Sequence, residues 1–185
     1  MVYPIFALIL LIIVIITSFY VMIYMISLVY SLLMGSPFVK TKSRTLDRVF
    51  KEANLKPNQL IIDLGCGDGK IVRTAAKHYK LRGIGVDINP LLIYRAKIMA
   101  KLEHLSSVTF YRQNIFDADI SEADVVYLFL LPRFLVKLRA KLKNETKKDV
   151  LIISHGFQIE DWSKYMIKKI EGKPFSTFYY RLHSA

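Results

Sequence analysis

The stretch IIDLGCGDGK, residues 61–70, joins an apolar run to a carboxylate and then places a glycine at every second position. The apolar run predicts a buried strand over residues 60–64. A helix is predicted from Lys70, because apolar side chains recur on one helical face at Val72, Ala75, Ala76 and Tyr79. A glycine-rich turn between a strand and a helix lets a ligand approach the backbone closely. Residues 65–69 are therefore a candidate binding loop.

The alternation of strand and helix patterns continues along the chain. Further strands are predicted at residues 82–87, 107–111, 124–130 and 149–154. Helices are predicted over 46–53 with Leu46, Val49, Phe50 and Ala53 inward, from Pro90 with Leu92, Ala96, Met99 and Leu102 inward, and from Pro132 with Leu135, Leu138 and Leu142 inward. Such alternation predicts an α/β fold, a parallel sheet covered on both faces. Two strand-like runs, 165–171 and 175–182, flank a turn at residues 172–174 and predict an antiparallel hairpin at one edge.

The first 39 residues contain no charged side chain, and apolar residues dominate from Ile5 to Met34. This run exceeds the roughly 20 residues that a helix needs to cross a bilayer. It is also longer than the core of a signal peptide and lacks a basic segment before it. Glycine and proline at Gly35 and Pro37 end the helical pattern. We expect residues 1–36 to form a transmembrane anchor and residues 37–185 to form the folded domain.

The charge of the chain lies entirely behind this anchor. All 27 Lys and Arg and all 15 Asp and Glu follow Val39, so the net charge of +12 belongs to the second part. Five basic residues come directly after the anchor, at Lys40, Lys42, Arg44, Arg48 and Lys51. The positive-inside rule predicts a single-pass protein with its domain on the cytoplasmic side, or on the matrix side in a mitochondrion. We expect this basic segment to face anionic lipid headgroups. Nucleic acid is a less favoured partner, because Lys and Arg are scattered over most of the predicted helices.

Three kinds of nucleotide-binding loop compete for residues 63–70. A phosphate-binding P-loop needs a glycine where Leu64 stands and Ser or Thr where Ile71 stands, so it is excluded. A dinucleotide-binding loop has glycine or alanine at the position that Lys70 occupies here, so a dinucleotide loop is disfavoured. The third pattern, acid-x-Gly-x-Gly-x-Gly, is satisfied by Asp63, Gly65, Gly67 and Gly69. It resembles motif I of the class I S-adenosylmethionine-dependent methyltransferases.

This resemblance implies a Rossmann-like fold and the cofactor S-adenosyl-L-methionine. The glycines would admit the methionine part, and Asp63 would supply negative charge near its ammonium. Asp87, at the end of the second strand, would accept the ribose hydroxyls, and Asn114 would contact the adenine between Ile88 and Ile115. Cys66 lies inside the loop, is counted among the cofactor-binding residues and is interpreted as a small packing residue rather than a nucleophile. As the only cysteine, it excludes an internal disulfide and fits a reducing compartment.

Five segments in order resemble one family more closely: SPFVKT, DLGCGDGKIV, GVDINPLL, FLLPRFLVKLRAKL and HGFQIEDW. They are similar to the membrane-anchored protein-lysine methyltransferases of mitochondria, which act on the c-ring protein of ATP synthase and the adenine nucleotide translocase, and to the soluble archaeal protein-lysine methyltransferases. The resemblance implies methylation of a lysine in a membrane-associated protein. Methylation of RNA or of a small molecule, or a catalytically silent cofactor-binding scaffold, are the alternatives.

The residues on the substrate side are weaker candidates. The carbonyls of Leu131 and Pro132 would orient an amine, although proline also simply starts helices. Phe38 and Thr41 would close over the cofactor, or serve only as a linker. His155 is a candidate base, but an exposed histidine is the favoured interpretation, and Trp162 is assigned to the core or an interface. We assign no catalytic base, since an apolar pocket can by itself favour a neutral lysine amine. We expect no metal ion, and the oligomeric state stays open.

Overall fold

The computed structural model describes residues 2–33 and 43–182 of the 185-residue chain. The chain divides into two compact units, Met1–Phe38 and Val39–Ala185. Phe38, Thr41, Lys40 and Lys42, which the sequence singled out, lie outside the described residues.

The first unit is one long helix, α1, Val2–Leu33. Its segment Tyr3–Ile26 is long and apolar enough to cross a membrane, judged by length and composition. The hydroxyl of Thr17 donates to the carbonyls of Ile13 and Val14, at 2.9 and 3.0 Å. The helix therefore satisfies this polar side chain internally, as an apolar surrounding would require.

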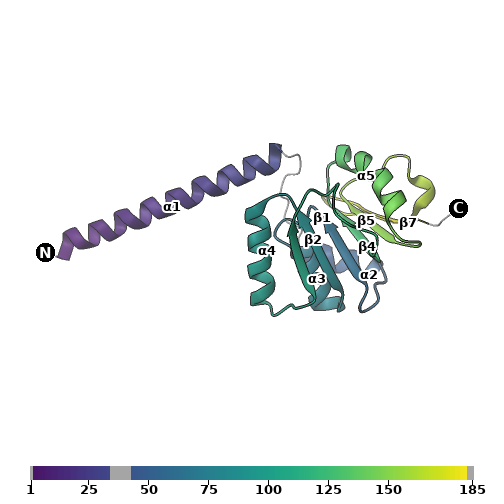
Figure 1. The fold of residues 1–185 in the computed structure, drawn as a ribbon, viewed down its shortest axis with the longest axis horizontal. Helices are drawn as coiled ribbons and strands as arrows, with labels where there is room; N and C mark the ends of the chain where they lie inside the picture. The colour runs from purple at the N-terminus through teal and green to yellow at the C-terminus, as the bar shows by residue number, and fades with distance from the viewer. Residues whose placement is uncertain (1, 34–42, 183–185) are drawn as a thin grey trace. The chain divides into compact units, whose positions relative to one another are not determined.

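The second unit is a seven-stranded sheet with helices on both faces (Figure 1). Its elements in chain order are α2 (Ser43–Glu52), β1 (Leu60–Leu64), α3 (Lys70–Tyr79), β2 (Arg82–Asp87), α4 (Pro90–Leu102), β3 (Val108–Arg112), β4 (Val125–Leu128), α5 (Pro132–Glu145), β5 (Leu151–His155), a 3-10 turn (Ser163–Tyr165), β6 (Met166–Ile170) and β7 (Thr177–Arg181). The strand order is β3-β2-β1-β4-β5-β7-β6. The first five strands are parallel, while β7 runs antiparallel to β5 and β6. The predicted α/β fold with an antiparallel edge hairpin is confirmed.

The strand order reverses beside β1. The chain winds outward from β1 to β2 and β3, then returns to β4 on the other side of β1. In open α/β sheets, ligands bind outside the carboxyl ends of the strands at such a reversal. The glycine loop leaves the sheet at this point, because it follows the last residue of β1.

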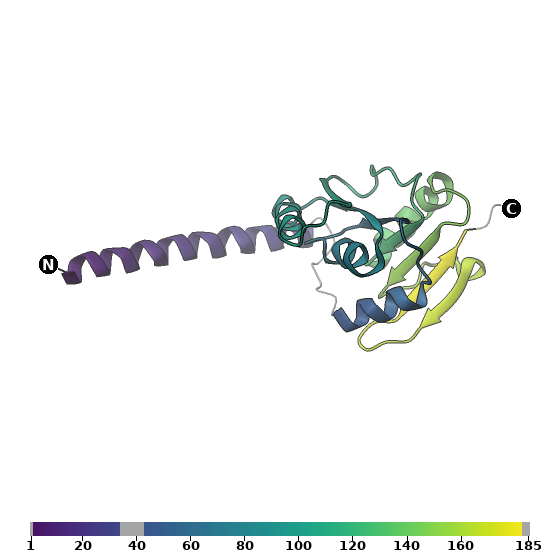
Figure 2. The ribbon, with the colours of Figure 1, turned by 90° about the horizontal axis from the view of Figure 1, so that it is seen from below.

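Alternating side chains along the strands form one core on each face of the sheet. Helices α2, α3 and α4 cover one face, packing on strand residues such as Ile61, Tyr127 and Phe110. Helix α5 and Trp162 cover the other face, over Ile62, Leu128 and Ile152 among others. Figure 2 shows α2 and α5 on opposite sides of the sheet.

The predicted inward face of α4 is partly wrong. The structure buries Leu92, Ile93, Ala96 and Ala100, whereas Met99 is only half-buried and Leu102 is 67% exposed. The sequence of α4 carries apolar residues on more than one face, so periodicity alone does not select one. The choice is made by close packing, because Ala96 lies against the glycine loop and Phe110, where only a small side chain fits.

Candidate functional site

The glycine loop leaves β1 in a left-handed backbone conformation. Gly65, Gly67 and Gly69 have φ values of 88°, 55° and 73°, a region that other residues adopt only with strain. Gly69 is also the N-cap of α3 and has no side chain with which to cap it. The path of the backbone therefore favours glycine at these three positions.

Two of these glycines are also required by the packing of the protein itself. A side chain at Gly65 would come within 2.9 Å of Leu130 Cδ2, and one at Gly69 would collide with the ring of Phe110. Leu130 belongs to the connection between β4 and α5, so this connection lies directly against the glycine loop. The absent side chains at these two positions make room for neighbouring residues of the protein, while the loop still offers its backbone at the carboxyl edge of the sheet.

The carboxylate of Asp87 ties the loop to the end of β2. Its Oδ2 accepts a hydrogen bond from the Gly67 N–H at 2.8 Å, and its Oδ1 accepts one from the Asn89 N–H at 2.8 Å. Burial raises the pKa of Asp87, and these backbone hydrogen bonds oppose that rise. A half-buried carboxylate held in this way presents its remaining lone pairs at a defined place, as the binding of two ribose hydroxyls would require.

Asp63 is the most unusual group of the site. It is 2% exposed, and its Oδ2 has no hydrogen-bond partner among the described residues. Burial raises the pKa of Asp63 well above its ordinary value, and the charges of Asp87 and Asp68 raise it further. A buried carboxylate beside two others is unfavourable without a compensating cation. Among the described residues, no group of His, Cys, Asp or Glu is arranged to hold a metal ion. That the ammonium of the cofactor supplies the compensating charge at Asp63 stays a prediction.

The acidic character of this edge also decides against a phosphate ligand. Asp68 and Asp87 lie close enough to Asp63 for their charges to raise its pKa, and all three carboxylates lie near the loop from which a phosphate would have to be bound. Like charges repel, so the backbone N–H groups of this loop do not form an anion site of the usual kind. The cofactor predicted from the sequence carries an ammonium and a sulfonium, and its charge matches that of the site.

Asn114 follows β3 by two residues and is exposed. Its Oδ1 accepts a hydrogen bond from the Phe116 N–H at 3.2 Å, which shapes the loop. The preceding residue, Gln113, donates its N–H to the Asp87 carbonyl at 3.1 Å, so this loop is joined to the end of β2. Ile88 and Ile115 are both half-buried. The predicted adenine contacts of Asn114, Ile88 and Ile115 stay predictions.

The candidate substrate side begins at the end of β4. Leu131 is the N-cap of α5 and Pro132 its first residue. The carbonyl of Leu131 accepts hydrogen bonds from the N–H groups of Phe134 and Leu135, at 2.9 and 3.3 Å. Helix initiation is therefore one role of this pair, and a role in orienting an amine stays a prediction.

His155 is not an exposed histidine, and that interpretation was wrong. It is 2% exposed at the end of β5, and its Nδ1 lies 2.8 Å from Thr177 Oγ1 on the paired strand β7. The rings of Phe129 and Phe175 pack edge-on against it, with centroids at 4.7 and 5.9 Å. Burial lowers the pKa of His155 to about 4, so the ring is neutral and only weakly basic near pH 7.

The remaining assignments concern packing. Cys66 is buried among Val72, Ala96 and Phe110, and burial raises the pKa of its thiol well above the ordinary value. This burial agrees with a packing role within the loop, and a contact of Cys66 with the cofactor stays a prediction. Trp162 is buried against Tyr165 and Tyr180, with ring centroids at 5.5 and 6.0 Å, which confirms its place in the core.

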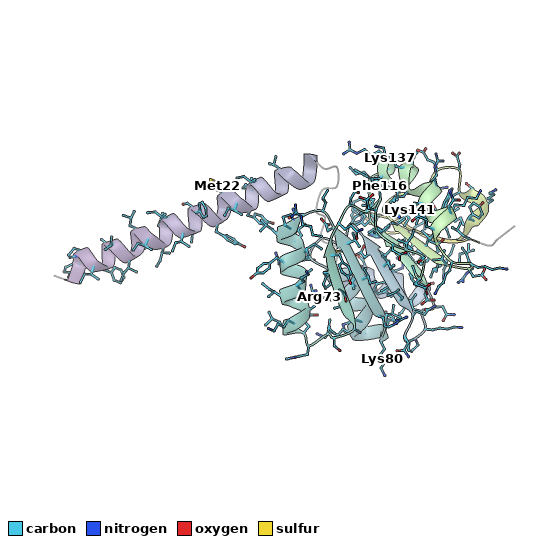
Figure 3. The ribbon with its side chains drawn as sticks, in the orientation of Figure 1. Met22, Arg73, Lys80, Phe116, Lys137 and Lys141 are labelled. Atoms are coloured by element: carbon cyan, nitrogen blue, oxygen red, sulfur yellow. The ribbon has the colours of Figure 1, made fainter. Side chains whose placement is uncertain are left out.

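Sequence reasoning missed two residues at this edge. Asp68, inside the loop, is 8% exposed, with Arg95 Nε 3.9 Å from its Oδ2. Asn89 is buried and caps α4, its Oδ1 accepting hydrogen bonds from the N–H groups of Leu91 and Leu92 at 3.0 and 3.3 Å. The Asn-Pro pair before a helical pattern was the available signal for this cap. Arg73 of α3, labelled in Figure 3, is not part of this edge and forms an ion pair with Glu103, the C-cap of α4.

The fold and this acidic, glycine-lined edge define an S-adenosylmethionine-dependent methyltransferase. The crystal structure of an RNA methyltransferase from Salinibacter ruber in complex with S-adenosyl-L-homocysteine is similar to this chain, with a TM-score of 0.76 and 32% sequence identity. The similarity covers 80% of this chain and 95% of that one. The cofactor of the present chain is thus S-adenosyl-L-methionine, as its sequence predicted.

The chain belongs to the family of ANTKMT methyltransferase domains, which matches residues 63–166. It is 36% identical to the protein-lysine N-methyltransferase of Saccharolobus islandicus (strain REY15A) over 139 residues, covering 73% of this chain and 85% of that protein. It is 28% identical over 127 residues to the adenine nucleotide translocase lysine N-methyltransferase of Mus musculus. That match covers 68% of this chain, which spans 55% of the length of the mouse protein. The family resemblance noted from the sequence is confirmed.

Proposed function

We propose that the chain is a membrane-tethered protein-lysine N-methyltransferase. The observation that carries this proposal is the similarity to the Saccharolobus islandicus lysine methyltransferase, which extends over 85% of that protein. When bound, the cofactor would supply an activated methyl group for in-line transfer to a neutral amine, in which the S–C bond breaks as the N–C bond forms and S-adenosyl-L-homocysteine is released. The chain's own residues then have to hold the cofactor, align the amine and let it lose a proton.

The described contacts support a division of these tasks. Asp63 would pair with the cofactor ammonium, since its Oδ2 is buried and lacks a partner among the described residues. Asp87 would hold the ribose from a position already set by the N–H groups of Gly67 and Asn89. Asn114 would meet the adenine from the loop after β3. Phe38 and Thr41 are proposed to close over the cofactor.

The acceptor is proposed to reach the end of β4. Leu64, Leu128 and Ser154 are register partners, so the residues that follow them stand side by side at the carboxyl edge. The residue after Leu128 is Phe129, which lies between the glycine loop and His155 and packs on the histidine ring. Apolar side chains in this place would disfavour the charged form of a lysine. Loss of its proton to solvent then needs no dedicated base, and the weakly basic His155 is not assigned that task.

The tether is proposed to be residues 1–36, with residues 37–185 as the methyltransferase domain. The apolar segment Tyr3–Ile26 and the absence of charged residues before Lys40 support a single span. The basic segment after it would place the domain on the cytoplasmic side of the membrane, or in the matrix of a mitochondrion. A short tether raises the effective concentration of membrane-bound acceptors. We therefore propose that the acceptor lysine lies in a membrane-associated protein, close to the bilayer.

RNA is the second candidate substrate, because the Salinibacter ruber neighbour is an RNA methyltransferase. One experiment separates the two. The full chain, purified in detergent, is incubated with methyl-labelled cofactor, membranes and total RNA, and labelled products are identified by mass spectrometry. Asp87→Ala is the inactive control, and Lys143→Ala, an exposed position on α5, is the matched active one.

Label on lysine of a membrane protein, lost in Asp87→Ala and kept in Lys143→Ala, is the expected result. If only RNA is labelled, the methyl acceptor is RNA and the lysine proposal is wrong. Cofactor binding without label in either fraction would leave a scaffold as the function and reject the proposal.

A further inference from the structure

The outer face of α4 is an apolar surface that the catalytic domain leaves uncovered. In the described residues 43–182, the exposed large apolar side chains are Leu91, Tyr94, Ile98, Leu102, Tyr111 and Ile167, and the first four belong to α4. They are 42%, 66%, 41% and 67% exposed, in that order. Side chains project from the outer side of α4, away from the sheet (Figure 3).

These four side chains form one continuous stripe. Their spacing is three or four residues, and at about 100° per residue they fall within an arc of about 80°. The opposite side of the helix carries Ile93, Ala96 and Ala100, which pack on Phe110 and the glycine loop. The helix is thus apolar on two faces, and only one of them is needed for the fold.

Basic residues border the stripe on both sides. Arg95 lies at one edge, and Lys97 and Lys101 lie at the other, all three exposed. The helix contains no acidic residue from Pro90 to Leu102, and the next one, Glu103, is ion-paired with Arg73. Arg95 Nε lies 3.9 Å from Asp68 Oδ2, so the charge of Arg95 is partly offset, and Lys97 and Lys101 carry the positive charge at the other edge of the stripe.

This pattern selects a lipid surface over a second copy of the chain. An apolar stripe with basic edges and an aromatic residue such as Tyr94 is the form of helices that lie in the headgroup region of anionic bilayers. Two copies of α4 facing each other would bring basic edges of the same sign together, without acidic residues to compensate them. Helix α5, in contrast, exposes no large apolar side chain.

We propose that the outer face of α4, formed by Leu91, Tyr94, Ile98 and Leu102 with Arg95, Lys97 and Lys101 at its edges, binds the surface of an anionic lipid bilayer. This contact is distinct from the N-terminal span and does not depend on which acceptor is methylated. Helix α4 begins three residues after Asp87, so its binding would hold the cofactor edge of the sheet beside the membrane.

Fluorescence quenching on the full chain tests this proposal. Ile98→Cys on α4 and Lys143→Cys on α5 are each labelled with an environment-sensitive fluorophore, since the buried thiol of Cys66 is expected not to react. The protein is reconstituted with vesicles of phosphatidylcholine alone, or of phosphatidylcholine with phosphatidylglycerol, that contain a lipid-attached quencher. We expect quenching several-fold stronger at position 98 than at position 143, and strongest with phosphatidylglycerol.

Two double variants distinguish an effect of the α4 face from an effect of the net charge of the chain. Lys97→Glu with Lys101→Glu should abolish the effect of phosphatidylglycerol at position 98, whereas Lys143→Glu with Lys148→Glu, with the same change in charge, should preserve it. Retained cofactor binding serves as the check on folding. Equal quenching at both positions, or no association with vesicles, overturns the proposal. If the fluorophore at position 98 becomes shielded from water as the protein concentration rises in the absence of lipid, the face mediates self-association. That result would overturn the proposal as well.

Discussion

The buried carboxylate of Asp63 is expected to lower the stability of the cofactor-free protein. Because its folded-state pKa is raised, the stability of the cofactor-free protein should fall as the pH rises above the ordinary aspartate value of about 3.9. Asp63→Asn should therefore increase the free energy of unfolding of the cofactor-free protein near pH 7 by about 1–2 kcal/mol, and its melting temperature should rise accordingly. The same variant should weaken binding of S-adenosylmethionine at least about tenfold, the loss of one charge-assisted contact.

Differential scanning calorimetry and titration calorimetry give the two measurements. Glu122→Gln, at an exposed position between β3 and β4, is the matched control and should change neither. A variant with lower stability and unchanged affinity would show that Asp63 has a structural role only.

His155 should make the domain sensitive to mild acid. The unfolded histidine titrates near pH 6.5 and the folded one near 4, so the unfolded state binds more protons between these values. Stability should then fall as the pH is lowered through this window, by about 2 kcal/mol at pH 5 relative to pH 7. His155→Gln should remove most of this slope in urea denaturation. A slope that is unchanged in the variant would assign the acid sensitivity to other groups.

Asp87 is expected to contribute to cofactor binding directly and through the loop. Asp87→Ala removes the acceptor for ribose and also leaves the N–H groups of Gly67 and Asn89 without their partner. S-adenosylmethionine should bind more weakly by about 1–3 kcal/mol, the scale of hydrogen bonds to a charged group. Asp117→Ala, at an exposed position, is the control. Unchanged affinity in a folded variant, measured by calorimetry, would remove Asp87 from the site.

At the scale of elements, the contact between α3 and β2 depends on a missing side chain. A Cβ at Gly83 would collide with Val72 of α3 and would lie 3.5 Å from Val108 of β3. Gly83→Ala should therefore destabilise the domain by about 1–3 kcal/mol through overpacking. Val72→Ala makes room, so the double variant should be more stable than the two single effects predict when added. Urea denaturation of the four proteins measures this coupling, and strict additivity would show that the helix does not press on Gly83.

For the whole molecule, the anchor and the domain are expected to be separable. A chain lacking residues 1–36 should be soluble, bind S-adenosylmethionine with unchanged affinity and methylate a membrane-embedded acceptor more slowly than the full chain does, since it loses the tether. Both forms should methylate equally well a soluble peptide that carries the acceptor lysine and its neighbouring sequence. Equal rates on membranes would contradict the tether, and an aggregated product would show that the domain needs the N-terminal segment in order to fold.

Much of the fold and part of the site follow from local sequence patterns. The apolar run before Asp63, the alternating glycines and the polar residues at strand ends depend on neighbours only a few positions away. They therefore predicted the succession of strands and helices along the chain and the binding loop, while the cofactor was implied by the resemblance of that loop to a known methyltransferase motif. Backbone conformation explains why this works, since left-handed φ angles at residues 65, 67 and 69 strongly favour glycine.

The tertiary structure alone decided where chemically ambiguous residues point. His155 is buried because β7 pairs with β5 and because Phe129 and Phe175 cover its ring, and those contacts come from distant parts of the chain. The unpartnered oxygen of Asp63 and the exposed stripe of α4 likewise appear only after the sheet is assembled. Periodicity records that a helix is apolar on two sides, but close packing against Gly69 and Phe110 determines which side is buried, because only the small Ala96 fits there.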